Sequence, residues 1–315
     1  MMERGGFLGM CLAEWRKACG RGLAWAVLLF GVLHGVAGAG AVWVGARAEA
    51  NMVAEAVDST SWLVAGEMAV SLAALPINGL ALLLLFSMVW AEDFSLGTIA
   101  MVFVRPVPRW KVFAAKGAVS MTAAFTSVAL ALLAGLVLGL PLFGLQGDLT
   151  RIGPDTPLIG WMGTAQGSVL LTLLGGLVAG TLVALPAMAM AAFLGALTRS
   201  PVLTLFGSMM ALLADAGVAA GFILWNKLEL GTCQQAAIKA GSVNSAEDLD
   251  KIVCPDAETA ERLHDLTIWA GRSFLGMRGQ ADFWADATQP IVVTLAWSAL
   301  LLGLALMLFT RRDVN

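Results

Sequence analysis

Residues 74–116 read ALPINGLALLLLFSMVWAEDFSLGTIAMVFVRPVPRWKVFAAK, an apolar run followed by a charged segment. A second apolar run, 117–141, follows at once. The charged segment opens with Glu92 and Asp93 and contains a Pro-x-Pro at 106–108. A bilayer core of about 30 Å is crossed by about 20 apolar residues in a helix, and charged side chains are costly inside it. Two membrane-crossing stretches therefore flank a segment that we expect outside the bilayer.

The composition places the whole chain in the membrane class. The 315 residues are 59% hydrophobic and 13% charged, against about 25% charged in soluble domains, and the mean hydropathy is +0.82. We predict an all-α integral membrane protein with six transmembrane helices. The fourth run is longer than a span needs, so we expect it to tilt, to protrude or to kink at Pro186. The predicted spans are 22–45, 69–90, 117–141, 166–197, 202–226 and 289–310.

The distribution of Lys and Arg predicts that both termini are cytoplasmic. Short connections rich in these residues stay on the cytoplasmic side. The short outer loops contain only Arg47 and Arg151. Tryptophans at predicted helix ends, where an amphipathic ring prefers the interface, agree with these spans: Trp25, Trp43, Trp90 and Trp225. The cytoplasmic side holds Arg4, Arg16, Lys17, Arg21, Arg105, Arg109, Lys111, Lys116, Arg199, Arg311 and Arg312.

Residues 1–21 carry charges throughout and lack the apolar core and cleavage site of a signal peptide. Phe7, Leu8, Leu12 and Trp15 fall on one helical face. This pattern predicts an amphipathic helix in the inner interface; the alternative is an ordinary basic tail before the first span.

The segment 91–116 predicts a short helix, a rigid break and a second helix on the cytoplasmic side. Asp93 or Ser95 can cap the first helix, and the prolines of 105–108 forbid a regular helix there. Anchoring to anionic headgroups would account for the basic residues alone. It would not account for the two acids or the Pro-x-Pro, so we favour a docking surface.

Several residues of this segment resemble the signature of type-2 ABC (ABC-2 type) transporter permeases: an acid, a Gly-Thr, a Pro-x-x-Arg and a following Lys. In that family the segment between the second and third spans is a coupling helix that sits in a cleft of the ATP-binding subunit. The layout of the whole chain is similar, with closest likeness to the permeases of nitrous-oxide reductase maturation, gliding motility and sodium or antibiotic export. The 227–288 loop is longer than in simple members. The resemblance implies these ATPase-coupling residues: Glu92, Asp93, Gly97, Thr98, Arg105, Pro106, Arg109 and Lys116.

The sequence contains no Gly-x-x-x-x-Gly-Lys-Ser/Thr loop for nucleotide phosphates. We therefore expect no enzyme activity and no cofactor on this chain, with ATP and Mg on a partner ATPase subunit. The resemblance implies two ATP-binding subunits, a second permease chain in a homodimer, export, and a place in the bacterial cytoplasmic (inner) membrane. We expect no nucleic-acid partner. Two alternatives stay open: an ABC-type mechanotransmitter acting on an envelope partner, and a stand-alone secondary carrier using Asp215.

The predicted domains are the interfacial helix 1–21, spans one to five in 22–226, an extracytoplasmic helical loop 227–288, and span six with a cytoplasmic tail in 289–315. Helix starts are expected near Ser245 and Asp256. The loop either gates an exit, docks an extracytoplasmic protein, or is a plain connector.

Cys233 and Cys254 share this loop, where an oxidising compartment favours a disulfide worth about 3 kcal/mol. Their spacing, even with His264 nearby, is a weak zinc signal, so we expect no metal site. Inside the spans the acid Asp215 is the intramembrane polar candidate, either for substrate contact or for a helix–helix hydrogen bond.

Overall fold

The computed structural model describes residues 6–20, 22–50, 65, 69, 76–95, 108–143, 169–239, 254–267 and 283–311. Within these ranges every regular element is an α-helix, which confirms the all-helical class. The helices are α1 (Phe7–Gly20), α2 (Leu23–Ala50), α4 (Pro76–Ser95), α6 (Arg109–Phe143), α8 (Val169–Val183), α9 (Leu185–Thr198), α10 (Pro201–Lys239), α12 (Pro255–Asp265) and α13 (Phe283–Arg311).

Five helices of the described part are long and apolar enough to cross a membrane, so the chain is a multi-pass membrane protein. The helix α4 lies within and just beyond the second predicted span, 69–90. A count of six spans stays a prediction. The five are Trp25–Val44, Arg109–Leu142, Gly176–Thr198, Pro201–Lys239 and Thr288–Arg311.

Of the three outcomes expected for the long fourth run, an interruption beside Pro186 is present. The helix α8 ends at Val183, Ala184 forms a turn, and α9 begins at Leu185 with the proline in its first turn. Proline lacks the N–H that would continue the helical hydrogen bonds, but it is well tolerated at the start of a new helix.

The helix of the fifth predicted span, 202–226, does not end at residue 226, because α10 continues without a break to Lys239. Its 39 residues make a rod of about 58 Å, roughly twice the thickness of the bilayer core. Residues 227–239, KLELGTCQQAAIK, have no proline and mostly favour helix, so nothing stops the helix where the apolar run ends. Likewise α13 begins at Phe283, inside the predicted loop.

The C-terminal half of α10 packs against α12, which begins where the sequence predicts a helix near Asp256. The Asn226 side-chain amide donates to the backbone carbonyl of Ala257 at 2.9 Å. The structure contains the Cys233–Cys254 disulfide, which joins the two helices. Trp297 of α13 donates to the carbonyl of Leu266 just beyond α12. The helix start expected at Ser245 lies outside the described residues.

The centre of the bundle is α4, whose large side chains pack on the small residues of α9. Trp90 is 1% exposed and does not lie in the interfacial belt expected from its place at a span end. Its ring lies 4.8 Å from that of Phe113, and its backbone passes so close to Gly195 that an added Cβ would lie 3.1 Å from the Trp90 Cβ. The small side chains of α9 make room for it, namely Ala187, Ala191, Ala192 and Gly195.

A second close contact joins α2 to α6. A Cβ added at Gly31 would lie 2.5 Å from the carbonyl oxygen of Ser127, and one at Gly35 would lie 2.6 Å from that of Ala131. Such small residues let helix backbones approach closely in lipid. The Ser127 hydroxyl adds a hydrogen bond to the Val27 carbonyl across this seam.

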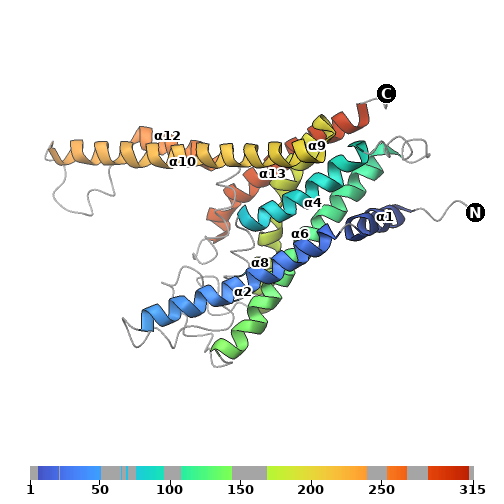
Figure 1. The fold of residues 1–315 in the computed structure, drawn as a ribbon. Coiled ribbons are helices and arrows are strands. Elements are labelled where there is room, and N and C mark those ends of the chain that lie inside the picture. The colour runs from blue at the N-terminus through green and yellow to red at the C-terminus, as the bar shows by residue number, and fades with distance from the viewer. Residues whose placement is uncertain are drawn as a thin grey trace, which may run out of the picture.

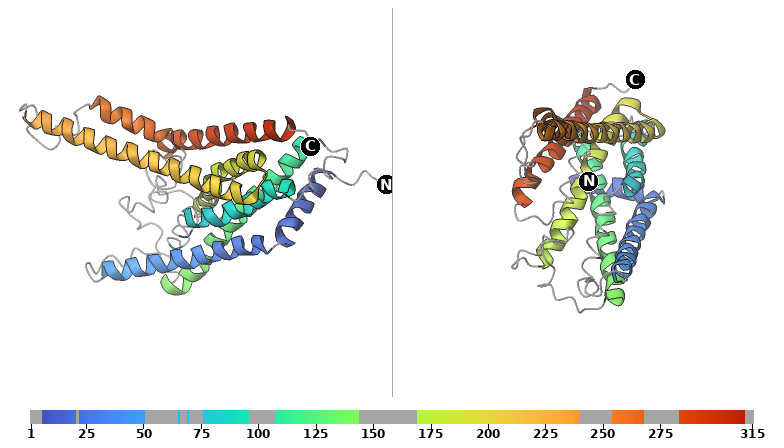
Figure 2. Two further views of the ribbon diagram at one scale, coloured as in Figure 1. Left: turned by 45° about the horizontal axis from the view of Figure 1, so that its top comes forward. Right: turned by 90° about the vertical axis from the view of Figure 1, so that its left-hand side faces the viewer.

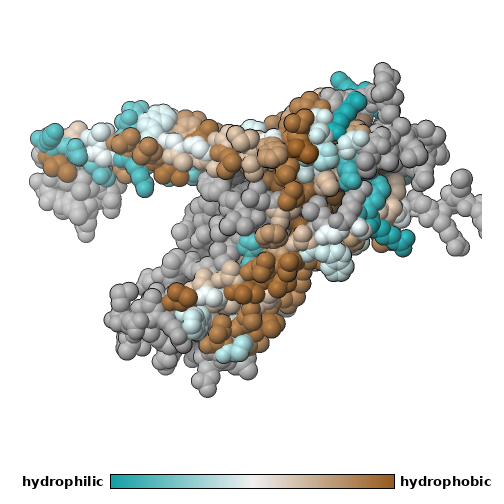
Figure 3. All heavy atoms as spheres, viewed as in Figure 1, coloured by the Kyte–Doolittle hydropathy of each residue, from teal (hydrophilic) through white to brown (hydrophobic). Residues whose placement is uncertain are grey.

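Figures 1 and 2 show that the two termini lie at the same end of the bundle, with α1 beside the N-terminus and the end of α13 beside the C-terminus. The α10–α12 pair extends at the opposite end. In Figure 3 hydrophobic residues cover much of the bundle, and hydrophilic ones gather near the termini and on the outer α10–α12 pair. This is the distribution expected of a protein whose middle faces lipid.

Candidate functional site

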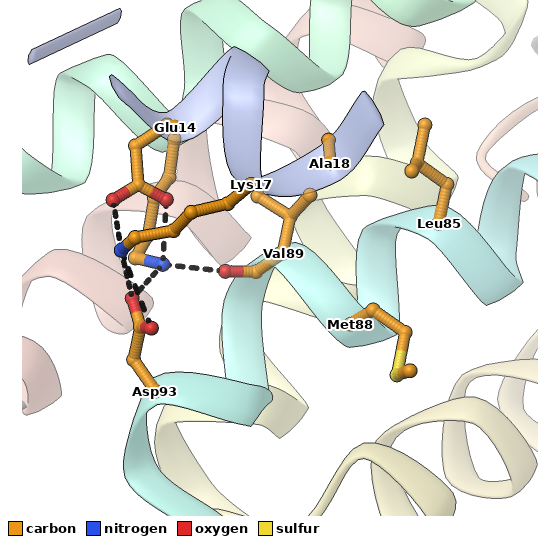
Figure 4. Close-up of a pocket in the computed structure, with 8 residues that line it drawn as sticks. Glu14, Lys17, Ala18, Leu85, Met88, Val89 and Asp93 are labelled. Atoms are coloured by element: carbon orange, nitrogen blue, oxygen red, sulfur yellow. Dashed lines mark hydrogen bonds and ion pairs between the residues drawn. The ribbon is translucent and has the colours of Figure 1, made fainter. Parts of the chain in front are cut away.

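Four charged side chains from three helices meet beside the segment between α4 and α6. We call Glu14 and Lys17 of α1, Asp93 of α4 and Lys116 of α6 the ion cluster. Lys116 Nζ lies 2.6 Å from Asp93 Oδ2 and 3.3 Å from Glu14 Oε2. Lys17 Nζ lies 2.8 Å from Glu14 Oε1 and 3.4 Å from Asp93 Oδ1. Figure 4 shows Glu14 and Asp93 pointing toward one another from different helices, with dashed lines to the ammonium groups.

The ion cluster is largely shielded from solvent. The side chain of Lys116 is 1% exposed and that of Asp93 is 7% exposed, whereas Lys17 is 38% exposed. The Lys116 ammonium also donates to the Val89 carbonyl at 2.6 Å, so its donors are well satisfied. Two acids and two bases leave the ion cluster with no net formal charge. This neutrality is what allows charged groups to be buried at acceptable cost.

The local sequence explains why each charge sits here. Asp93 lies in the last turn of α4, where the helix dipole disfavours an acid, so nearby cations are needed. Lys116 lies in the second turn of α6, on the side that faces α4. In α1, Leu8 and Leu12 are exposed, whereas Glu14 and Lys17 turn toward the bundle. A helix is therefore present where the amphipathic one is predicted, with Leu8 and Leu12 outward. Trp15 of the same predicted face packs against the core, and the paired charges face inward.

The pKa values follow from burial and pairing. Burial alone raises the pKa of the Asp93 carboxyl, but the Lys116 and Lys17 ammonium groups outweigh it and hold that pKa below 3.8, its ordinary value. For Lys17, burial lowers the pKa, and the Glu14 and Asp93 carboxylates more than reverse this, so the net pKa lies above 10.5. Both groups are therefore ionised at neutral pH.

A second contact fixes the start of α6 to the end of α13. Arg109 Nη1 donates to the Thr310 carbonyl oxygen at 2.8 Å, one of the last carbonyls of α13 that has no partner within its helix. Phe309 beside it packs edge-on against Phe94 of α4, at 5.7 Å between ring centroids, and against Phe113 of α6, at 5.8 Å. We call Arg109, Thr310 and these three rings the α13 clamp.

The expected ATPase-coupling residues therefore separate into groups. Gly97, Thr98, Arg105 and Pro106 lie outside the described residues. Glu92 is half-buried and engaged in contacts within the chain. Arg109 belongs to the α13 clamp.

Asp93 and Lys116 are buried in the ion cluster, so their side chains hold helices together and do not present a docking surface. At the same end of α6, Trp110 is 55% exposed, with the Lys111 ammonium 5.8 Å from its ring centroid. A partner would meet this part of α6 before it met the buried charges.

Glu14 and Lys17 were not predicted as site residues, because only the apolar face of residues 1–21 entered the prediction of the interfacial helix. One signal could have suggested them: Asp93 and Lys116 lie just beyond two span ends, and the preceding interfacial helix carries an acid and a base at i,i+3 spacing. Opposite charges at equal depth in the membrane tend to pair.

The remaining expectations concern other helices. Asp215 is half-buried on α10, is engaged in contacts within the chain, and is not a member of the ion cluster. Within the described ranges no group of three or more His, Cys, Asp or Glu side chains is arranged to hold a metal ion. The ion cluster offers paired charges and buried contacts; the chemistry it suits is the joining of helices.

Comparison with known proteins adds a family but no relative. No curated protein and no solved structure matches this chain. A family model described as "Protein of unknown function (DUF2705)" matches residues 48–222. This match covers more than half of the chain, from the end of α2 through α4, α6, α8 and α9 into α10. The chain therefore belongs to the DUF2705 family.

Proposed function

We propose that this chain is the membrane subunit of an ATP-driven transporter of the type-2 ABC class, an exporter moved by a separate ATPase that docks on segment 91–116. The observation that carries the proposal is the anchoring of both flanks of residues 96–107. On one side Asp93 is joined to α1 and α6 through the ion cluster. On the other, Arg109 and Phe113 are joined to α13. A push on the intervening segment would therefore move four helices together.

The mechanism follows from the stiffness of these connections. Helices transmit force along their axes, and packed interfaces respond as discrete rearrangements. The helix α6 runs for 35 residues from the docking region. It packs along α2 at the close contact made by Gly31 and Gly35. The energy must come from another chain, because the sequence has no phosphate-binding loop. In this arrangement Asp93 and Lys116 act as positioning residues, and the exposed residues of the segment make the contact with the ATPase.

The test separates docking from transmission. The chain is purified in mild detergent with its natural partners, and any chain bearing a phosphate-binding loop is identified by mass spectrometry. We expect Arg105→Glu with Trp110→Ala to abolish recovery of the ATPase. We expect Lys116→Met to retain the ATPase but to uncouple it, so that ATP hydrolysis no longer changes the labelling of single cysteines placed in α13. Lys239→Gln, at the far end of α10, is the matched control.

The proposal fails if a folded wild-type chain brings down no ATP-binding partner. It also fails if the docking variant recovers as much ATPase as the control. If no ATP-binding partner is recovered but transport still occurs, the secondary carrier is favoured. Transport by the Asp215→Asn variant would then be the measurement to make.

One observation favours a second function, the mechanotransmitter. The rod α10 continues well past its apolar part and carries α12 on a disulfide, which is a suitable lever for an extracytoplasmic partner. Hydrolysis by the reconstituted complex separates the two functions. A transporter is stimulated by a transported compound, whereas a mechanotransmitter is stimulated by its protein partner and loses this response when α12 is deleted.

A further inference from the structure

A pocket outside the ion cluster lies between α10 and α12. It is an open hollow of about 230 Å³ lined by Phe222, Ile223, Asn226 and Lys227 of α10 and by Glu261 and His264 of α12. On α10 the apolar lining residues, Phe222 and Ile223, come first. The polar ones, Asn226 and Lys227, follow within about one turn. The pocket is therefore amphipathic.

Its depth in the membrane follows from the sequence of α10. Counting about 20 residues for a bilayer core from Val202 reaches Gly221. Phe222 and Ile223 then lie at the edge of the core, and Lys227 lies at headgroup level. Trp225, which is 37% exposed between them, is a residue that prefers this boundary. The pocket opens where a lipid headgroup and the first part of its acyl chains would pass.

The charges of the pocket are of both signs. Lys227 is exposed on α10 and Glu261 is exposed on α12, and neither forms an ion pair within the part of the chain that the structure describes. Neighbouring polar groups already have partners: Arg262 lies 3.9 Å from Glu258, and His264 Nδ1 lies 3.4 Å from Asp265 Oδ1. The Asn226 amide is held by Ala257. One cation and one anion therefore remain to face a ligand across an apolar floor.

We propose that this pocket binds a phospholipid with a zwitterionic amine headgroup, of the phosphatidylethanolamine type. Lys227 donates to the phosphate, Glu261 accepts from the primary ammonium, and Phe222 with Ile223 contacts the acyl chains. A purely anionic lipid satisfies Lys227 but brings no cation for Glu261. The inference requires only that α10 crosses the membrane, so it stands or falls independently of the ATP-driven function.

The test is lipid binding to the full chain in maltoside micelles, followed by native mass spectrometry. Short-chain phosphatidylethanolamine, short-chain phosphatidylglycerol and soluble phosphoethanolamine are titrated separately. We expect the ethanolamine lipid to bind more tightly than the glycerol lipid. The soluble headgroup should bind more weakly than either, because it lacks the acyl contact.

Two variants assign the charges. Lys227→Gln should weaken both lipids by about twofold to fivefold, the range of exposed ion pairs. Glu261→Gln should weaken only the ethanolamine lipid by a similar factor and so remove the preference. Glu258→Gln, one turn earlier on α12 and outside the pocket, is the matched control. All three substituted residues are exposed, and retention of the Cys233–Cys254 disulfide reports that α10 and α12 stay joined in each variant.

Three results would overturn the proposal. Equal binding of the two lipids would remove the role of Glu261. Equal loss in the Glu258→Gln control would show a general charge effect. Binding of soluble phosphoethanolamine as tight as that of the lipid would reassign the pocket to a free phosphate ester.

Discussion

Replacing Lys116 by Met tests whether the ion cluster behaves as one coupled unit. Methionine fills a similar volume and is tolerated in irregular cores, so the change removes the ammonium and little else. Asp93 would keep Lys17, whose Nζ lies 3.4 Å from its carboxylate and is partly exposed. The Val89 carbonyl would lose its side-chain donor.

The magnitude follows from the burial of the partners. Removing one member of a buried ion pair costs about 3–5 kcal/mol, because the other charge is left uncompensated. Lys17 still offsets part of the Asp93 charge, so we expect about 3 kcal/mol. At roughly 2 °C per kcal/mol for a chain of this size, the apparent Tm should fall by about 6 °C.

The assay is a double-mutant cycle on thermal unfolding in detergent, read by size-exclusion chromatography of heated samples. Buried ionic groups can often be replaced by apolar residues at little or no cost when all partners change together. We therefore expect Lys116→Met with Asp93→Leu to be more stable than Lys116→Met alone, since Glu14 and Lys17 remain paired at 2.8 Å. If the double variant loses the sum of the two single losses, the charges are not coupled and the reasoning is refuted.

Other perturbations test other parts of the structure. Gly35→Leu should lower stability by about 1–3 kcal/mol through overpacking at the α2–α6 seam, whereas Gly40→Leu, where nothing lies within 4 Å of an added Cβ, should be neutral; comparing their Tm values checks this. The contribution of Asp93 is fully present above pH 3.8, the ordinary pKa of its carboxyl, and is lost as the pH falls through its lower pKa in the folded chain. A Tm series should be flat near neutrality and should fall in acid, and Asp93→Asn should remove part of that fall. Reducing the Cys233–Cys254 bond, which closes a separation of 21 residues, should cost about 3 kcal/mol and should release α12 to proteolysis, as seen on gels.

The helices themselves could be predicted from the sequence, because an apolar run of about 20 residues has few alternatives in lipid. The proline at 186 likewise identified the break between α8 and α9. The end of α10 could not be predicted in this way. The apolar pattern reports where lipid ends, whereas a helix ends only where the backbone is interrupted. The predicted span ends at residue 226, and α10 ends thirteen residues later, at Lys239.

The ion cluster shows a different limit. The sequence places Asp93 and Lys116 near span ends, but nothing local says that Glu14, 102 positions before Lys116, will be their partner. Long-range pairing depends on how the helices pack, and Trp90 became buried for the same reason. Local patterns therefore located the candidate site without defining its contacts or the direction in which its side chains point.

The ion cluster also has an electrical consequence. Moving one elementary charge across a membrane potential of 100 mV involves about 2.3 kcal/mol of work. The cluster holds two acids and two bases in contact, with Asp93 and Lys17 both ionised at neutral pH. If α1, α4 and α6 shift together, these four charges move as a neutral set and draw almost no work from the field. The ion cluster itself should therefore add no voltage dependence to such a motion, whether the cell is energised or depolarised.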